Sequence, residues 1–535
     1  KELQTDMLKK KEAGSAMSKK RTKTEERTER RISAVTSLSM CAMTIIAQIA
    51  ITLLVTRLLE ESANVVYFIL RLAGSVVAIR VYQRPGSPSY KLVWMCLLLA
   101  LPVSGMILFW LWGGTHQAKS LSLRKIPLPL ERESLRMESA ANVSRLNRQS
   151  PSWGRLAAYL QKRGFWLYRN TQARYFGDGA DFFEDLIDHL RQAEVYIFLE
   201  YYIIAEGGIW DRIFAVLREK AAAGVEVRVI FDDFGNLTRL SDTMLQAIQD
   251  AGIEVEVFNP VHRYVNRIYF NYRDHRKIAV IDGYYAYTGG INLADEYANL
   301  IVRFGHWKDS GVRIEGEGAW GFAVQFMHMW KMIGRTLPNE DDYYRPRQEG
   351  TGNGWCQPFT DGPMNNPDNP IEETYLQLIS SARRFLYITT PYYAVEEYMQ
   401  RALCIAADGG VDVRLMVPAV PDKKYVYMVA ETYWGELLAH GVKIYRYTPG
   451  FLHAKSVMVD REVALVGSTN MDYRTFQLHY ECGVLLYHMP AVEELLEDMD
   501  AIMAQSHLYT LEEWNQRPWY RRVFASILKL GAIWL

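Results

Sequence analysis

One short pattern of residues occurs twice in this chain and constrains the fold more than any other feature. The pattern reads H-x-K-x4-D and then G-[GS]-x-N, and the first glycine follows the aspartate by seven positions in both copies. Its members are His275, Lys277, Asp282, Gly289, Gly290 and Asn292 in the first copy and His453, Lys455, Asp460, Gly467, Ser468 and Asn470 in the second. Two copies in the same register indicate a duplicated unit with the same chemistry in each half.

The apolar stretches around the two copies also correspond, which predicts equivalent strands. The pairs are 195–199 with 385–388, 223–230 with 409–416, 251–255 with 440–444 and 277–282 with 455–460. Amphipathic helix patterns precede the first pair. Strands that alternate with helices predict an α/β fold with mixed sheets flanked by helices. We therefore expect two pseudo-twofold-related halves, at 166–350 and 351–515, with the twin motifs at their interface.

The side chains of the motif suit the binding of a phosphodiester. A histidine and a lysine two positions apart on a strand point to the same face, and the asparagine after the next strand reaches the same rim. We expect the two lysines to neutralise a phosphate and the two asparagines to donate hydrogen bonds to its non-bridging oxygens. The candidate phosphate-binding residues are Lys277, Asn292, Lys455 and Asn470.

Two histidines in one site allow covalent catalysis. One imidazole attacks phosphorus, and the other protonates the leaving alkoxide and then deprotonates the acceptor. The unperturbed pKa of histidine is ~6.5, so both roles are available near neutral pH. We expect the aspartates, which end their strands before turns, to brace the motif. The candidate catalytic set is His275, Lys277, Asp282, His453, Lys455 and Asp460.

The sequence does not predict a metal site. The lysine in each H-x-K repels a cation, and zinc needs more ligands at close spacing. The five cysteines show no C-x-x-C spacing, which opposes structural zinc and a disulfide framework. We interpret most of the other histidines as structural or surface residues because they have no partner in the repeat: His116, His189, His262, His306, His328, His440, His479, His488 and His507.

Net charge gives no indication of nucleic-acid binding. Lysine plus arginine and aspartate plus glutamate both number 61, so the formal net charge is zero. Nucleic-acid binding proteins usually carry an excess of positive charge. Aromatic residues make up 13% of the chain, which suits a large core and a membrane interface.

The amino-terminal region predicts membrane attachment. Residues 1–31 form a basic, polar tail, and 32–55 carry no charge, which is long enough to cross a bilayer core of ~30 Å. A second apolar stretch at 63–81 contains Arg71, and a third at 92–112 ends in tryptophans typical of the headgroup interface. We expect two or three hydrophobic helices within 32–115, then a linker and lead-in at 116–165.

The membrane topology depends on the second stretch. The basic tail predicts a cytoplasmic amino terminus. Three full spans would place the rest of the chain outside, whereas a re-entrant or interfacial second segment would keep it inside. A central arginine costs a few kcal/mol in a bilayer, so we favour a multi-pass membrane protein with a cytoplasmic catalytic part.

Longer stretches around both motifs carry a family resemblance. They read N-Y-R-D-H-R-K at 271–277, G-G-I-N at 289–292 and G-S-T-N-M-D-Y-R-T-F at 467–476, with further support at 198–202, 390–393 and 517–520. The chain resembles the phospholipase D superfamily, which is marked by paired HKD motifs. More narrowly, it is similar to bacterial cardiolipin synthases of the phospholipase D type. The resemblance covers nearly everything after residue 32.

The resemblance implies a reaction and a set of roles. Two phosphatidylglycerols would give cardiolipin and glycerol by phosphatidyl transfer, without a metal or nucleotide cofactor, so the expected partners are these lipids and the bilayer. His275 would be the nucleophile, and His453 the general acid and base. A carboxylate would orient each histidine: Glu481, 28 residues after His453, is the candidate in the second half, and Asp309 is its counterpart in the first, with Ser468 in support. The chain departs from the family pattern at His479, where asparagine is expected.

Several alternatives remain open at this point. A phospholipase D hydrolase uses the same motif with water as acceptor, and another transferase would use a different alcohol. A superfamily nuclease would not need the hydrophobic segments, and the intact second motif opposes a non-catalytic scaffold. The tail at 516–535 suits an amphipathic helix on anionic lipid or a helix packed on its own core. The basic stretch at 263–273 would bind headgroups or remain a solvated loop.

Overall fold

The computed structural model describes residues 50, 63–113, 133–237, 239–260, 272–345, 352, 354–365 and 368–532. The predicted tail at 1–31, nearly all of the first apolar run and the basic stretch up to residue 271 lie outside the described residues. The chain forms two compact units, residues 1–114 and residues 115–535. Each unit is described by itself.

The described part of the first unit consists of three helices, α2 (Ala63–Gln83), α3 (Pro88–Ala100) and α4 (Pro102–Trp112). They pack together around Trp94 and Leu98. Within the described residues, one helix is long and apolar enough to cross a membrane, and it runs from Val65 to Gln83 within α2. The predicted second segment is therefore a continuous apolar helix.

The third apolar run is not one helix, so its interpretation as a single continuous segment is wrong. The break lies at Leu101, with φ −129° and ψ 71°. Pro102 excludes the helical conformation from the residue before it and provides no N–H group for the preceding turn. The resulting helices have 13 and 11 residues, or about 20 and 17 Å at 1.5 Å per residue, which is shorter than a bilayer core.

The first half of the second unit contains a seven-stranded sheet within its described residues. Its first four strands are antiparallel to their neighbours, and the last three run parallel to one another. The strands, in spatial order, are β1 (Thr171–Phe176), β9 (Gly311–Gly316), β7 (Tyr285–Gly289), β6 (Lys277–Ile281), β2 (Tyr196–Tyr201), β3 (Glu226–Asp232) and β4 (Glu254–Phe258).

The second half repeats this order and these directions and adds one strand at the far edge. This match confirms the predicted duplication and the mixed sheets. Its main strands, in spatial order, are β10 (Trp355–Asp361), β19 (His479–Tyr487), β17 (Val463–Gly467), β16 (Ser456–Val459), β11 (Phe385–Thr389), β13 (Asp412–Pro418), β14 (Lys443–Tyr447) and β20 (Ser506–Tyr509).

The helices form where capping residues and apolar spacing direct them. In α8 (Gly179–Gln192), the side chain of Asp178 accepts a hydrogen bond from the N–H of Ala180, and apolar residues recur on one face. Its counterpart α13 (Pro370–Ser381) begins at a proline, whose missing N–H costs nothing at that position. The further helices are α6 (Glu133–Gln149), α7 (Pro151–Lys162), α9 (Gly208–Ala222), α10 (Asp233–Asn236), α11 (Asp242–Asp250), α12 (Gly318–Met332), α14 (Glu397–Asp408), α15 (Lys424–Ala439), α16 (Tyr473–Leu478), α17 (Pro490–Ala504), α18 (Leu511–Asn515) and α19 (Trp519–Lys529).

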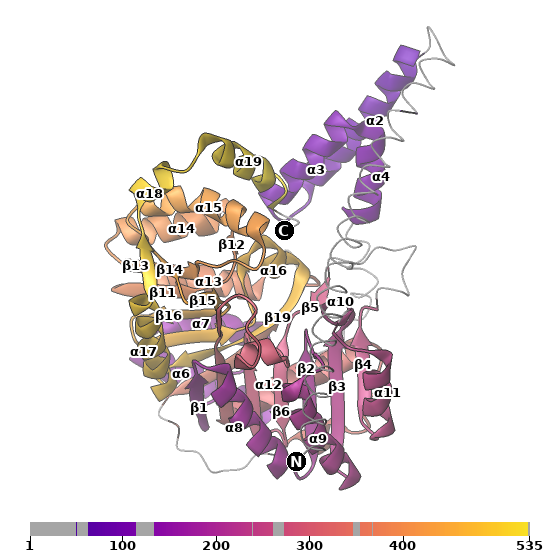
Figure 1. Cartoon of the computed structure of the whole chain (residues 1–535), viewed down its shortest axis with the longest axis vertical. Helices are drawn as coiled ribbons and strands as arrows, with labels where there is room; N and C mark the ends of the chain where they lie inside the picture. Colours follow the sequence, from indigo (N-terminus) through magenta and orange to yellow (C-terminus); the bar gives the residue numbers. More distant parts are fainter. Residues whose placement is uncertain are drawn as a thin grey trace, which may run out of the picture. The chain divides into compact units, whose positions relative to one another are not determined.

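The two sheets share a core that joins the halves. One buried cluster takes side chains from facing strands of both sheets, such as Phe198 and Val484, and from α12 and α17. The outer face of the first sheet is covered by α8, α9 and α11, and that of the second by α6, α7 and α13 to α15 (Figure 1). Because both faces of the central strands β2 and β11 are covered, their sequences are largely apolar, and Glu200 in β2 is the one charged residue in these two strands.

The carboxyl-terminal helix α19 has two different faces. Ala525 is buried against the protein, and Arg521 forms an ion pair with Glu431 of α15 at 2.9 Å. The opposite face is apolar, with side chains that are 51–76% exposed: Trp519, Tyr520, Val523, Phe524, Ile527 and Leu530. The helix therefore packs on its own core, as one alternative predicted, and also exposes an apolar face.

Candidate active site

The two motif strands lie at the centres of their sheets. β6 lies between β2 and β7, and β16 lies between β11 and β17. Each strand ends in a tight turn at the motif aspartate, and Asp282 and Asp460 adopt left-handed φ angles of 53° and 55°. Asparagine and aspartate tolerate this conformation better than most residues. The turn leads to the strand that ends in the motif glycine.

The motif aspartates brace the fold, as their position predicted. The carboxylate of Asp282 accepts hydrogen bonds from the backbone N–H groups of residues 194–196, each at 2.8 Å. Asp460 accepts from those of residues 383–385, also at 2.8 Å. The two aspartates thus fix the starts of the central strands β2 and β11. Each aspartate lies at the opposite end of its motif strand from the histidine.

Two short parallel strand pairs join the halves at the histidines. β15 (Gly450–Leu452) pairs with β8 (His306–Lys308), and Leu452 lies opposite Lys308. β5 (Arg273–Asp274) pairs with β19, and Asp274 lies opposite Tyr480. In the first pair, His453 directly follows Leu452 and Asp309 directly follows Lys308. In the second pair, His275 follows Asp274 and Glu481 follows Tyr480. Each histidine therefore lies beside a carboxylate of the other half.

These carboxylates hold both imidazoles. Glu481 Oε1 lies 2.9 Å from His275 Nδ1, and Asp309 Oδ2 lies 2.6 Å from His453 Nδ1. Because a carboxylate only accepts hydrogen bonds, each Nδ1 carries the proton and each Nε2 keeps its lone pair. The structure places the two predicted carboxylates at the histidines, but the expectation that each half supplies its own carboxylate is wrong. The two short strand pairs cross between the halves, so neither half holds a complete site.

The second residues of the two G-[GS] pairs differ for a steric reason. Ser468 Oγ donates to Glu481 Oε2 and accepts from the N–H of Cys482 at 3.0 Å. At the equivalent Gly290, a Cβ atom would lie 2.1 Å from Asp309 Oδ1. The longer glutamate leaves room for a serine, whereas the shorter aspartate requires glycine.

The two lysines are buried beside the histidines. Lys277 Nζ donates to the carbonyl oxygen of His275 at 2.5 Å, and Lys455 Nζ donates to that of His453. Burial lowers the pKa of Lys277 to about 8 against the raising effect of Glu481, and burial lowers that of Lys455 to about 7. Both ammonium groups remain available to neutralise an anion at neutral pH, and both titrate far below a solvated lysine.

Burial and the neighbouring lysines hold the two imidazoles neutral. Burial, followed by the charge of Lys277, lowers the pKa of His275 well below its usual value. Burial and Lys455 lower the pKa of His453 to about 4, although Asp309 raises it. A bound phosphodiester would bring negative charge and favour protonation of one imidazole. His275 and His453 are only 8% and 7% exposed, so the reacting atoms lie in a largely desolvated environment.

The asparagines of the motifs are buried and take part in local hydrogen bonds. Asn292 Oδ1 accepts from the N–H of Ile203 at 3.1 Å, and its Nδ2 donates to Tyr297 Oη at 2.6 Å. Asn470 Nδ2 donates to Thr475 Oγ1 at 3.2 Å. An amide nitrogen carries two hydrogens, so each asparagine can still donate one to a phosphate oxygen.

A buried ionic network around the first motif was not predicted. Arg276 contacts Glu200 at 2.5 Å and Asp274 at 3.1 Å. Arg273 lies 3.3 Å from Asp232, which also accepts from the N–H of Asp274. The available signal was a charged residue inside the apolar strand at 198–202, because a buried charge needs a partner.

His479 is the second feature that the sequence did not predict. Its ring lies 5.5 Å from that of His275, and its Nδ1 lies 3.4 Å from Glu481 Oε1. This histidine, which has no partner in the repeat, thus lies beside the first motif histidine and its carboxylate. The donor atoms of His275, His479 and Glu481 lie within 4.8 Å of one another, but the neighbouring cations Lys277 and Arg474 oppose a metal ion there.

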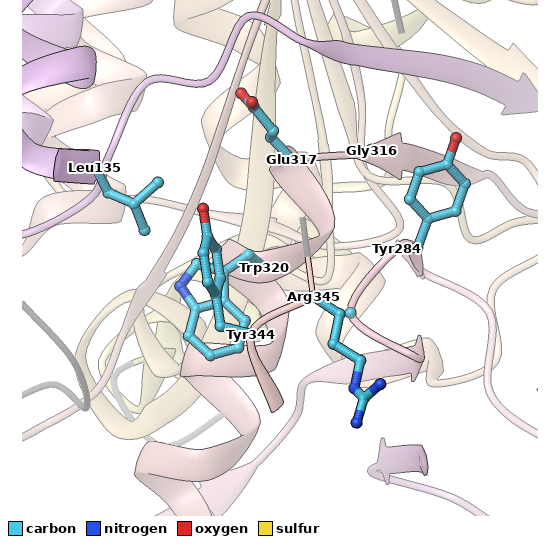
Figure 2. Close-up of a pocket in the computed structure, with 8 residues that line it drawn as sticks. Leu135, Tyr284, Gly316, Glu317, Trp320, Tyr344 and Arg345 are labelled. Carbon is cyan, nitrogen blue, oxygen red and sulfur yellow. The ribbon is translucent and has the colours of Figure 1, made fainter. Parts of the chain in front are cut away.

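A small cavity occurs elsewhere in the unit and does not involve the motif side chains. It lies beside the turn between β6 and β7, and Figure 2 shows Trp320, Tyr344 and Arg345 around it. Its lining residues are Leu135, Gly283, Tyr284, Gly316, Glu317, Trp320, Tyr344 and Arg345. The chemistry of this protein is therefore assigned to the crossed histidine pairs.

The duplicated fold and its shared pair of histidines define a phospholipase D-like protein. The family model described as "Cardiolipin synthase, PLD-like domain" matches residues 186–312 and 375–503, and one described as "Phospholipase_D-nuclease N-terminal" matches 72–114. A phosphatidylserine synthase structure from Haemophilus influenzae Rd KW20 has the same fold, with a TM-score of 0.54 and 17% identity over 68% of this chain and 95% of that one.

Three relatives extend the comparison to sequence. The major cardiolipin synthase ClsA of Bacillus subtilis is 31% identical over 87% of this chain and 97% of its own length. A cardiolipin synthase of Alkalihalophilus pseudofirmus is 32% identical over 85% and 90%. An uncharacterized protein of Streptococcus mutans is 40% identical over 70% and 82%. The chain belongs to the phospholipase D-like cardiolipin synthase family, and it is an enzyme of the phosphatidyl transferase class.

Proposed function

We propose that this enzyme transfers a phosphatidyl group from one phosphatidylglycerol to another, forming cardiolipin and releasing glycerol. The observation that carries the proposal is the pair of crossed histidine–carboxylate contacts, flanked by Lys277 and Lys455. One phosphodiester bond breaks and one forms, so the exchange needs no nucleotide. The two lysines supply the positive charge that a metal would otherwise provide.

In the first step, His275 Nε2 attacks phosphorus of the donor lipid. The bond from phosphorus to the glycerol oxygen breaks, and His453 Nε2–H transfers its proton to that oxygen. The pKa of His453, about 4 in the empty site, rises when the anionic phosphate is bound, which makes the imidazolium available as the acid. Glu481 accepts the Nδ1–H of His275 and so balances the positive charge of the phosphorylated imidazole.

In the second step, the headgroup of another phosphatidylglycerol takes the place of glycerol. His453 Nε2 removes the proton from its hydroxyl group, and that oxygen attacks phosphorus. The bond between phosphorus and His275 breaks, which restores neutral His275 and protonated His453. Asp309, 2.6 Å from His453 Nδ1, stabilises the imidazolium and holds its orientation. Lys277, Lys455, Asn292 and Asn470 bind the non-bridging oxygens in both steps.

The choice of a lipid alcohol over water is supported by the surroundings of the histidines. The ring of Tyr202 lies 4.9 Å from that of His275, and the rings of Trp307 and Tyr297 lie 5.2 and 5.6 Å from that of His453. Such aromatic surroundings disfavour water near the intermediate. The same centre would support hydrolysis or another acceptor if water or another alcohol reached it.

A product assay tests the proposal. Purified full-length protein is incubated with phosphatidylglycerol vesicles and chelator, and the products are separated by mass spectrometry. We expect cardiolipin and free glycerol in equal amounts. Phosphatidic acid as the only product would establish a hydrolase instead, and no reaction without an added alcohol would indicate a different acceptor.

We further propose that the enzyme works at the bacterial cell membrane, with its catalytic unit in the cytoplasm. Helix α2 supports the attachment, and the basic tail at 1–31 supports the orientation. The exposed apolar face of α19 is proposed to lie in the lipid interface. The packing of the carboxyl-terminal end of α19 supports this choice. Leu528 and Ala532 pack on Ala394 of strand β12 (Tyr393–Ala394). This strand pairs with β18 (Met471–Asp472), which directly follows Asn470. We propose that a lipid substrate enters the site from this side.

A further inference from the structure

We infer that His479, fixed by Arg474, is a positioning residue for His275: it gives Glu481 a second imidazole donor and so holds the carboxylate that orients the nucleophile. The inference rests on the proposed role of His275.

The local chain places the three side chains together. Asp472 caps α16 by accepting from the N–H of Thr475, and this short helix carries Arg474. The chain then enters β19 at His479, which pairs with Arg273 of β5. Residues two apart on a strand share a face, so His479 and Glu481 point toward the same side of β19. The interface between the halves therefore sets the position of His479.

Arg474 determines which nitrogen of His479 carries the proton. Arg474 Nε lies 3.0 Å from His479 Nε2, and a guanidinium group can only donate. Nε2 must therefore accept, which leaves the proton of the neutral ring on Nδ1. Glu481 Oε1, at 3.4 Å, is the carboxylate oxygen in contact with this nitrogen.

The contact between His479 Nδ1 and Glu481 is longer than an ordinary hydrogen bond. Within the described residues, His479 Nδ1 is buried and makes no hydrogen bond of good geometry. Buried donors are almost always satisfied, and catalytic hydrogen bonds often shorten only when substrate binds. The 3.4 Å contact becomes a hydrogen bond when a phosphodiester occupies the site and His275 takes up its reactive position.

The charges around His479 keep it neutral. Burial lowers its pKa well below the usual value, and so do the four cations that face it from α16, β6, β5 and the start of α15: Arg474, Lys277, Arg273 and Lys423. Glu481 and the ring of His275 complete its charged and titratable surroundings. Burial raises the pKa of Glu481 against the lowering effects of Lys277 and Ser468. A neutral donor favours the ionised form of Glu481 without adding a charge that would repel protonated Lys277.

The equivalent position in the other half holds a different residue. The register of the two short strand pairs makes Trp307 the counterpart of His479, each two residues before its carboxylate. The Trp307 ring lies 5.2 Å from His453. The backbone N–H of Ser310 donates to Asp309 at 2.8 Å, whereas Glu481 receives the Ser468 hydroxyl and faces His479. Burial raises the pKa of Glu481 well above its usual value, whereas the pKa of Asp309 is low because His453 and Lys455 outweigh the raising effect of burial. Glu481 is therefore the carboxylate whose ionised form needs a further donor.

The experiment compares His479→Leu with His479→Asn, because the amide of asparagine can place an N–H near the position of Nδ1. The substrate is the p-nitrophenyl ester of phosphatidic acid, whose burst of p-nitrophenolate reports attack by His275 whether the final acceptor is a lipid or water. The burst rate is measured from pH 5 to 9, together with the melting temperature. His275→Ala serves as the reference for complete loss.

We expect His479→Leu to lower the burst rate at least about tenfold, the effect of one hydrogen bond to a charged group. Without this donor, Glu481 takes up a proton at a higher pH. The acid limb of the pH profile, where activity falls as the pH falls, therefore moves up by about one pH unit. His479→Asn should retain the acid limb and stay within about threefold. An unchanged acid limb in His479→Leu, or equal losses in both variants, would overturn the inference.

Discussion

Replacing Asp309 with asparagine tests the crossed pairing of histidine and carboxylate. The change removes a buried, charge-assisted hydrogen bond of 2.6 Å to His453 Nδ1. Such a bond is worth about 1.5–3 kcal/mol, or about 10- to 150-fold in rate. An amide that donates to Nδ1 would also move the imidazole proton to Nε2, so the ring could no longer accept a proton there. The combined loss should approach about 10⁴-fold.

Two substrates separate the roles of the two carboxylates. Glycerol leaves phosphatidylglycerol only when His453 protonates it, whereas p-nitrophenolate leaves without a proton. We expect Asp309→Asn to lose about 10³- to 10⁴-fold on phosphatidylglycerol but to keep the p-nitrophenolate burst within about tenfold. Glu481→Gln, which disturbs the nucleophile His275, should lose the burst as well.

A matched control is available on the surface. Asp408 Oδ2 lies 2.8 Å from His440 Nδ1, so Asp408→Asn removes the same kind of contact outside the site and should leave both rates unchanged. If Asp309→Asn lost the burst and Glu481→Gln kept it, His453 would be the nucleophile. Equal losses of the burst in both variants would refute separate roles for the two carboxylates.

Three other predictions follow from the geometry. The pKa of Lys455 is about 7 and that of Lys277 about 8, so each lysine loses its charge as the pH rises through its pKa. The KM for phosphatidylglycerol should therefore increase above about pH 7–8. The basic limb of the kcat profile should lie at higher pH, because the bound phosphate keeps the lysines protonated. Gly290→Ala puts a Cβ 2.1 Å from Asp309 Oδ1 and should lower kcat at least about 100-fold. Gly208→Ala, whose Cβ meets nothing closer than 3.7 Å, is the control. Full activity of the Gly290 variant would contradict the steric argument. Phe524→Glu on the exposed face of α19 should reduce turnover on vesicles at least about tenfold and leave turnover of a monomeric short-chain substrate and the melting temperature unchanged, and equal losses on both substrates would exclude the interface role.

The duplicated fold was predictable because the repeat fixes register. The same offsets between motif and strand occur in both halves, so β6 and β16 and their neighbours follow from spacing alone. The bracing role of Asp282 was predictable for a similar reason, since an aspartate at the end of an apolar strand before a turn suits backbone N–H groups there.

The crossed carboxylates were not predictable in their pairing. Asp309 and Glu481 could be selected as candidates, but their partners depend on the pairing of β8 with β15 and of β5 with β19. These strands have two or three residues and come from distant parts of the chain, so sequence periodicity carries no information on their register.

Backbone geometry explains two features that the pattern of residue types did not reveal. His479 was set aside because its counterpart, Trp307, is not a histidine, yet the strand register brings both rings to equivalent positions. The apolar run at 92–112 appeared continuous because hydropathy ignores the backbone, and Pro102 divides it. In both cases, backbone geometry outweighed the pattern of residue types.

The covalent intermediate gives the most direct test of the central claim, a single site built from both halves. Full-length enzyme is mixed briefly with phosphatidylglycerol, quenched and digested, and the modified peptide is identified by mass spectrometry. The account predicts a phosphatidyl group on His275 that disappears, with formation of cardiolipin, when more phosphatidylglycerol is added. Cardiolipin formation with no modified histidine, or modification of His453 alone, would contradict it.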